Sequence, residues 1–278
     1  MDRRAAGSLL MVLILVGAVT VPGIAGRTVG GTAAPGVRVQ PQPRTGDCLG
    51  PLTSPEQLNS VSDTVPVVPC SQLHSAEILA VGLLDTNLWR IRPTVGDAAF
   101  TSGALSEHCD QLAGAFLGWG GNRGSARIQV SFFTRLTVPD DLEWQLGQRW
   151  YACQVLPGVL DYPISYAGTA REASFRTPPG AFASCSDGPG ELAVSCDHPH
   201  SAEQIARTFD TTSAASADGR CRQLVGDIVG TKDPTFNGQL ALLTRVQGGA
   251  TGCWVTTTSS RNLTATLINH GNKPLPLR

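Results

Sequence analysis

Apolar positions in the first half of the chain alternate between strand-like runs and one helical stripe. Residues 77–84 form a compact apolar run that predicts a strand, with a helix as the alternative. Within residues 102–118 apolar side chains recur at spacings of three and four until glycines end the pattern, which predicts an amphipathic helix with Cys109 on its buried face. Residues 127–136 and 147–155 show the alternation expected of two further strands. A helix beside several strands predicts an α+β fold.

The second half shows the same pattern in a shorter form. Residues 221–229 predict a short helix, and strands are predicted over residues 238–246, 253–258 and 263–268. Residues 161–180, between the halves, are mixed in character and end in a Pro-Pro-Gly sequence. We therefore place an inter-domain linker at 161–180.

One sequence motif occurs twice. Cys-x3-His-Ser-Ala-Glu stands at residues 70–77 and again at 196–203, and each half has one cysteine before the motif and two after it. We therefore predict a tandem duplication of a small module of about 100 residues, in which a short helix packs on an antiparallel sheet. The two copies are placed at residues 46–160 and 181–278.

The sequence contains eight cysteines, four in each predicted copy. No Cys-x2-Cys or His-x3-His pair occurs, so the cysteines are predicted to form disulfides rather than a metal site. If each copy forms disulfides only between its own cysteines, and both copies use the same connectivity, three pairings remain open. We favour the pairing of first with second and third with fourth, which gives Cys48–Cys70, Cys109–Cys153, Cys185–Cys196 and Cys221–Cys253.

The N-terminus has the three parts of a secretory signal. Two arginines precede an apolar core at residues 9–21, and small residues follow where a signal peptidase would cut. The uncharged run over residues 5–26 is also long enough to span a bilayer, so segment 1–26 is predicted to be a cleaved signal peptide or a signal-anchor helix. Under both alternatives the rest of the chain is exported, where disulfides form. Residues 27–45, rich in proline and glycine, are predicted to be a linker.

Composition narrows the classes of partner. Charged residues make up 15% of the chain and the formal net charge is −1, so the chain has no strong field that would attract nucleic acid or anionic lipid. Nucleic acid is therefore excluded from the predicted partners. The 41% of hydrophobic residues is enough for ordinary domain cores.

The first copy resembles a known protein family along most of its length. The resemblance lies in Gly46-Asp47-Cys48-Leu49, in Val-x-Cys-x3-His-x2-Glu ending at Glu77, in a cysteine on the central helix, and in Trp-x2-Gly-x-Arg-x3-Cys from Trp144 to Cys153. These patterns resemble the septum formation domain of actinobacterial, mycobacterial-type envelope proteins. The second copy keeps the cysteines and the His-x2-Glu pair but lacks the tryptophan-glycine-arginine pattern. The resemblance implies an exported, usually membrane-anchored envelope protein and implies no known reaction.

Two His-x2-Glu pairs are the repeated polar residues, His74 with Glu77 and His200 with Glu203. Nitrogen and oxygen ligands of this kind would hold a zinc ion if both pairs met across a twofold axis. The simpler interpretation, which we favour, is that each pair hydrogen-bonds the turn that follows a cysteine. No catalytic residue, metal or cofactor is predicted.

Trp144 and Trp150 are aromatic candidates for binding a cell-wall glycan, although aromatic residues beside a helix-strand disulfide belong more often to a core. We expect a non-catalytic binding or scaffolding protein linked to septum formation or cell-wall assembly. Its expected partners are envelope or division proteins or a cell-wall polymer, with membrane contact through the N-terminal segment if it is not cleaved. The alternative is a zinc-dependent envelope hydrolase that uses both His-x2-Glu pairs.

Overall fold

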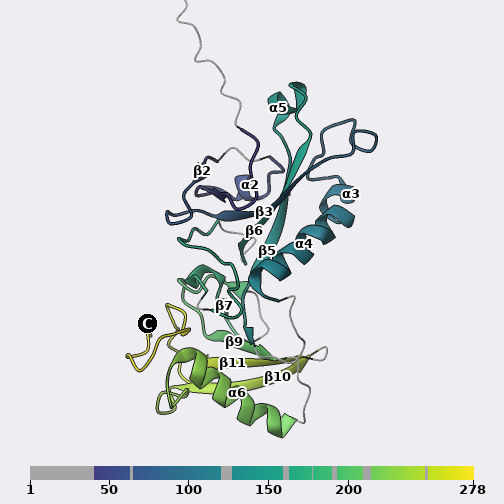
Figure 1. The fold of residues 1–278 in the computed structure, drawn as a ribbon. Coiled ribbons are helices and arrows are strands. Elements are labelled where there is room, and N and C mark those ends of the chain that lie inside the picture. Colours follow the sequence, from purple (N-terminus) through teal and green to yellow (C-terminus); the bar gives the residue numbers. More distant parts are fainter. Residues whose placement is uncertain are drawn as a thin grey trace, which may run out of the picture. The chain divides into compact units, whose positions relative to one another are not determined.

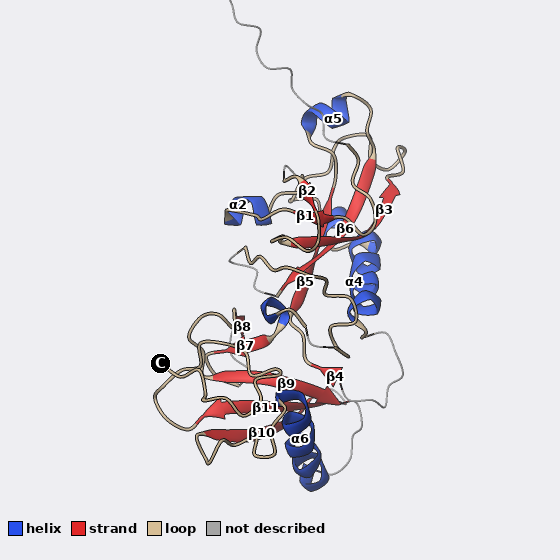
Figure 2. Cartoon of the chain, turned by 60° about the vertical axis from the view of Figure 1, so that its left-hand side comes forward, coloured by secondary structure: helices blue, strands red, loops and turns tan. Residues whose placement is uncertain are grey.

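The computed structural model describes residues 41–62, 65–119, 127–158, 163–176, 178–189, 193–208, 214–247 and 250–278 (Figure 1). The predicted signal or anchor segment and most of the predicted linker at 27–45 lie outside these ranges. Within them, no helix is both long enough and apolar enough to cross a bilayer. The described chain is α+β and contains two antiparallel sheets (Figure 2). The predicted fold class is confirmed at this level.

The first sheet has the strand order β2-β1-β3-β6-β5, and neighbouring strands are antiparallel. Its strands are β1 (Cys48–Leu49), β2 (Val67–Val68), β3 (Ala76–Leu83), β5 (Phe132–Thr137) and β6 (Trp150–Pro157). Helix α4 (Ala104–Leu117) packs against β3, β5 and β6. Three short helices lie in the connections, namely α2 (Pro55–Leu58), α3 (Ala98–Thr101) and α5 (Asp141–Gln145).

Helix α4 forms where the apolar spacing predicts it. Its buried residues are Cys109, Ala113 and Leu117, which follow one another at intervals of four and therefore share one face. Gly118 ends the helix with a φ of 88°, a left-handed conformation that glycine adopts without steric cost. The expected burial of Cys109 is confirmed.

The second sheet has the order β10-β11-β9-β7-β8, and a short strand, β4, also pairs with β9. Its strands are β4 (Arg127–Ile128), β7 (Ser184–Ser186), β8 (Ala193–Val194), β9 (Ala202–Thr208), β10 (Leu240–Gln247) and β11 (Ala250–Thr257). Helix α6 (Ala214–Val229) packs on β9, β10 and β11, and a 3-10 turn, η1 (Gly180–Phe182), precedes β7. The helix predicted over residues 221–229 is confirmed there and ends at Val229, but it is longer than predicted because it begins seven residues earlier.

The strand predicted over residues 127–136 is divided between the two sheets. Its first residues, in β4, pair with β9, and its last residues, in β5, pair with β6. Between them the Gln129 N–H donates to Ile205 O and the Ser131 N–H donates to Phe182 O. One continuous stretch of chain therefore leaves one sheet and enters the other with its backbone groups still paired. A second prediction, the strand at residues 263–268, was wrong, because only Leu263 forms isolated bridges there.

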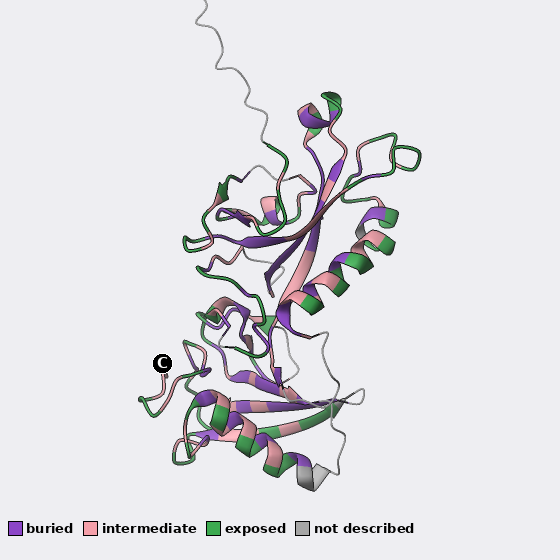
Figure 3. Cartoon of the chain, viewed as in Figure 1, coloured by how far each residue is buried: buried purple, intermediate pink, exposed green. Residues whose placement is uncertain are grey.

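Buried residues lie along both sheets (Figure 3), and their side chains form several separate clusters. In the first sheet, one cluster lies beneath α4 and includes Cys109 and Cys153. A second cluster includes Leu58 and Trp150 and contains no residue of α4. The second sheet has one large cluster, beneath α6, that includes Cys221 and Cys253.

Four disulfides close the fold in the favoured pairing. The bonds are Cys48–Cys70, Cys109–Cys153, Cys185–Cys196 and Cys221–Cys253, and no cysteine is free. Two of them join a helix to the strand beneath it, α4 to β6 and α6 to β11. The predicted disulfide pairing is confirmed.

Candidate functional site

Glu77 lies near the start of β3, directly opposite Cys48 on β1. Its carboxylate accepts hydrogen bonds from the Tyr166 hydroxyl at 2.9 Å, the Thr169 hydroxyl at 2.6 Å and the Ala170 N–H at 2.7 Å. The Glu77 side chain is buried, so these three donors replace the water that a carboxylate needs. Burial, together with the neighbouring Glu77 carboxylate, raises the pKa of Tyr166, which therefore stays protonated and remains a donor.

Glu203 occupies the corresponding place in the second sheet, on β9 opposite Cys185. It accepts hydrogen bonds from the Thr266 hydroxyl and from the Leu267 N–H at 2.8 Å. Glu203 is fully buried and has one donor fewer than Glu77. Burial raises the pKa of Glu203 to about 7 even though both hydrogen bonds lower it.

The two histidines also share one geometry. His74 pairs through its backbone with Tyr166, and His200 pairs in the same way with Leu263. In each ring Nδ1 lies 2.8 Å from a carbonyl oxygen two residues earlier, Gln72 O or His198 O, so Nδ1 carries a proton and donates it. Both Nε2 atoms are buried without a hydrogen-bond partner among the described residues. Burial lowers the pKa of His200, although the His198 carbonyl and Asp187 oppose this shift, and the ring is held neutral.

Together, each histidine and glutamate attaches a later segment of chain to its sheet. The segment at 166–170 is attached to the first sheet, and the segment at 263–267 to the second. In both segments a threonine follows three residues after the bridged residue, a recurrence that was visible in the sequence but not recognised. The favoured interpretation placed these bonds in the turn after the cysteine. This is correct for both histidines, whereas the glutamates bond segments more than 60 residues away.

A zinc site built from both pairs is not assembled in the described parts of the chain. The only group of three metal-ligating side chains found there is Cys185, Cys196 and Glu203, whose ligand atoms lie within 4.8 Å of one another. The two sulfur atoms of this group are joined in a disulfide, so they are not thiolates and do not offer the charge that zinc requires.

Trp144 and Trp150 are largely buried, at 9% and 4% exposure. The Arg149 guanidinium lies 3.9 Å from the Trp144 ring centroid, and Trp150 Nε1–H donates to Gln148 Oε1. Their burial leaves little ring surface for stacking on a sugar. The binding roles assigned to these tryptophans and to the two His-x2-Glu pairs stay predictions.

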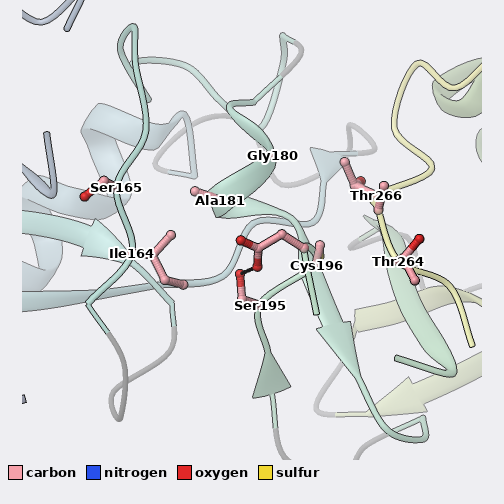
Figure 4. A pocket seen from close by; sticks show the side chains of 10 residues that line it. Ile164, Ser165, Gly180, Ala181, Ser195, Cys196, Thr264 and Thr266 are labelled. Atoms are coloured by element: carbon pink, nitrogen blue, oxygen red, sulfur yellow. Dashed lines mark hydrogen bonds between the residues drawn. The ribbon is translucent and has the colours of Figure 1, made fainter. Parts of the chain in front are cut away.

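A cavity of about 230 Å³ lies beside the Cys185–Cys196 disulfide (Figure 4). It is lined by short side chains and hydroxyls, and Thr264 and Thr266 stand at one end with Ile164 at the other. No pattern in the sequence pointed to it, because its lining comes from four separate stretches: 164–165, 180–181, 195–197 and 264–266.

Asp197 lies at this cavity between a hydroxyl and an imidazole. It accepts a hydrogen bond from Ser195 Oγ, and its Oδ1 lies 2.9 Å from His198 Nδ1. Against the raising effect of partial burial, the contacts with Ser195 and His198 lower the pKa of Asp197. In a nucleophilic triad the imidazole stands between the serine and the acid, whereas here the acid is in the middle. The arrangement therefore does not activate Ser195.

Comparison with known proteins identifies a family. No curated protein and no solved structure matches this chain. The family described as "Septum formation" matches residues 46–242 in one span, which begins just before β1 and ends within β10. The match covers well over half of the 278 residues, including the whole first sheet and the second sheet up to the start of β10. The Gly-Asp-Cys-Leu start and the two Cys-x3-His-x2-Glu motifs lie inside it. The chain belongs to the septum formation family.

Proposed function

We propose that this protein is a non-catalytic, exported component of the cell envelope that binds or scaffolds other envelope components during septum formation or cell-wall assembly. Family membership is the observation that carries the proposal. It is supported by four disulfides, which form outside the cytoplasm, and by the engagement of the Glu77 and Glu203 carboxylates within the fold. The proposed partners are division proteins, other envelope proteins or a cell-wall polymer.

The proposal includes a tandem duplication as the origin of the architecture. Support comes from the strand orders, since β2-β1-β3-β6-β5 and β8-β7-β9-β11-β10 correspond strand by strand in the order of the chain. Both sheets also have a helix bonded to the strand next to the edge, and a glutamate opposite the first cysteine. A shared ancestral module explains these correspondences without requiring that each arose separately.

The proposed location is the outer side of the cytoplasmic membrane in an actinobacterial cell, secreted or held by the N-terminal segment. The test is a reporter fused after residue 278 that is active only after export, followed by fractionation of the cells. A reporter that stays inactive and is recovered in the cytoplasmic fraction would contradict the proposal.

The role in division is tested by depleting the protein and measuring the spacing and completeness of septa. Rescue is then attempted with the wild-type chain and with variants in the His-x2-Glu pairs, and partners are captured by crosslinking in dividing cells. We expect misplaced or incomplete septa, rescue by any variant that folds, and recovery of an envelope component. Normal septa after full depletion, together with no crosslinked partner, would refute the proposal.

A further inference from the structure

Strand β10 forms an edge of the second sheet and is open on one side. It pairs with β11 along its whole length, and no other strand in the described part of the chain pairs with it. At eight residues it equals the longest strands of the fold. Open edges of this length are normally shortened, covered or charged, because unpaired N–H and C=O groups favour pairing with another strand.

Hydrogen bonds at the start of β10 show which residues turn toward the open side. The Thr258 N–H donates to Gln239 O on the β11 side, whereas the Leu240 N–H turns away from β11 and donates to Thr235 O. Successive residues of an antiparallel strand present their backbone groups to opposite sides. The N–H and C=O groups of Leu242, Thr244 and Val246 therefore point to the open side.

The corresponding edge of the first sheet, on β5, is covered in part by residues 57–62. The Val138 N–H donates to Val61 O, and Arg135 Nη1 donates to Gln57 O at 2.8 Å.

These covering residues lie between the first two cysteines, Cys48 and Cys70, which are 22 residues apart. Their counterparts Cys185 and Cys196 are only 11 residues apart, and the described residues between them contain no helix.

Side chains of β10, at the open edge of the second sheet, are apolar at positions where β5, at the covered edge of the first sheet, has a polar side chain. Arg135 faces Gln154 across β5 and β6 and is buried, with its Nε 2.9 Å from Gln154 Oε1. At the same position of the second sheet Leu243 faces Trp254, and Leu243 is 38% exposed. Val246, further along β10, is 55% exposed. An exposed apolar strand with free backbone groups is suited to protein association.

We propose that β10 is a dimerisation edge, which pairs antiparallel with β10 of a second molecule of this protein about a twofold axis at Thr244. This register pairs residues 241–247 with the same residues of the second molecule. It places Leu242 opposite Val246, so that apolar side chains meet on both sides of the axis. Arg245, the one charged residue of the strand, then faces Leu243 and not the second Arg245.

The self-complementarity of this strand favours a second molecule over an unrelated partner. A twofold axis brings together identical surfaces, which requires that no charge oppose itself, and β10 meets this condition. The joined edges would form one continuous sheet and leave no free edge on β10 in either molecule.

The test uses the full chain, exported so that its disulfides form and kept in detergent if it stays membrane-bound, and measures its mass by sedimentation equilibrium. Thr244→Pro removes an outward N–H, and it spares the β10–β11 ladder because Thr244 does not bond β11. We expect a dimer for the wild type, a dimer for the control Thr244→Val, and a dissociation constant raised at least about tenfold for Thr244→Pro.

Val246→Lys provides a second variant in case proline disturbs folding. It adds a charge to an exposed edge residue and is also expected to give monomers that still unfold in one cooperative transition, which shows that the monomer is folded. A wild-type chain that remains monomeric at its highest soluble concentration would overturn the proposal, and the edge would then be open to an extended segment of another protein. A dimer that both variants leave intact would equally overturn it.

Discussion

Replacing Glu203 with glutamine is expected to stabilise the protein at alkaline pH. The Glu203 carboxyl is fully buried with two donors, and its pKa is raised from 4.5 to about 7. Glutamine resembles the protonated carboxyl, because its carbonyl oxygen can accept from the Leu267 N–H while its amide donates to the Thr266 hydroxyl oxygen. The variant therefore keeps the segment at 263–267 attached without requiring a buried charge.

The sign of the pH dependence follows from linkage. Because the folded-state pKa lies above the unfolded value, the folded state holds the Glu203 proton more tightly. The contribution of this group to stability is fully present below pH 4.5 and is lost as pH rises through about 7. A difference of this size corresponds to about 3 kcal/mol of unfolding free energy, as an order of magnitude.

The assay is urea unfolding, followed by circular dichroism with the disulfides intact, at pH 5 and at pH 8. The free energy of unfolding of the wild type should decrease from pH 5 to pH 8. In Glu203→Gln most of this decrease should be absent. Other titrating groups contribute equally to both proteins, so the difference between the two pH dependences isolates Glu203. Equal pH dependence in the two proteins would refute the reasoning.

Three further predictions concern stability. Glu77→Gln, the matched change in the first sheet, should cost about 1–3 kcal/mol in urea unfolding at pH 7, because three donors face Glu77 and an amide group would oppose one of them; an unchanged midpoint would contradict this. Replacing both cysteines of the Cys109–Cys153 bridge with serine should cost about 4 kcal/mol, since the bond closes a 44-residue loop, and a thermal midpoint equal to that of the wild type would exclude it. Gly118→Ala should cost about 1–2 kcal/mol in thermal unfolding, because of the positive φ and a Cβ position 2.6 Å from the Phe175 ring, and a neutral result would contradict both reasons.

Features that depend on local sequence were predictable, and features that depend on distant partners were not. The spacing of apolar residues located α4, and the doubled cysteine motif reduced the disulfide pairings to three, of which the favoured one is correct. By contrast, nothing near Gln129 shows that its N–H donates to Ile205 and not to the first sheet. The partners of Glu77, Tyr166 and Thr169, lie about 90 residues later in a stretch that reads as a linker, so sequence reasoning found the glutamate but not its donors.

The passage of residues 127–137 from one sheet into the other has a consequence for attempts to divide this protein. A fragment that begins after residue 160 would retain β9 but lose Arg127 and Ile128, and the β9 edge that they cover would meet solvent. A fragment that ends at residue 160 would keep Arg127 and Ile128 but lose β9, so these two residues would have no strand to pair with. Dissection of the chain into autonomous pieces should therefore yield material that precipitates, and both halves are expected to melt in a single transition.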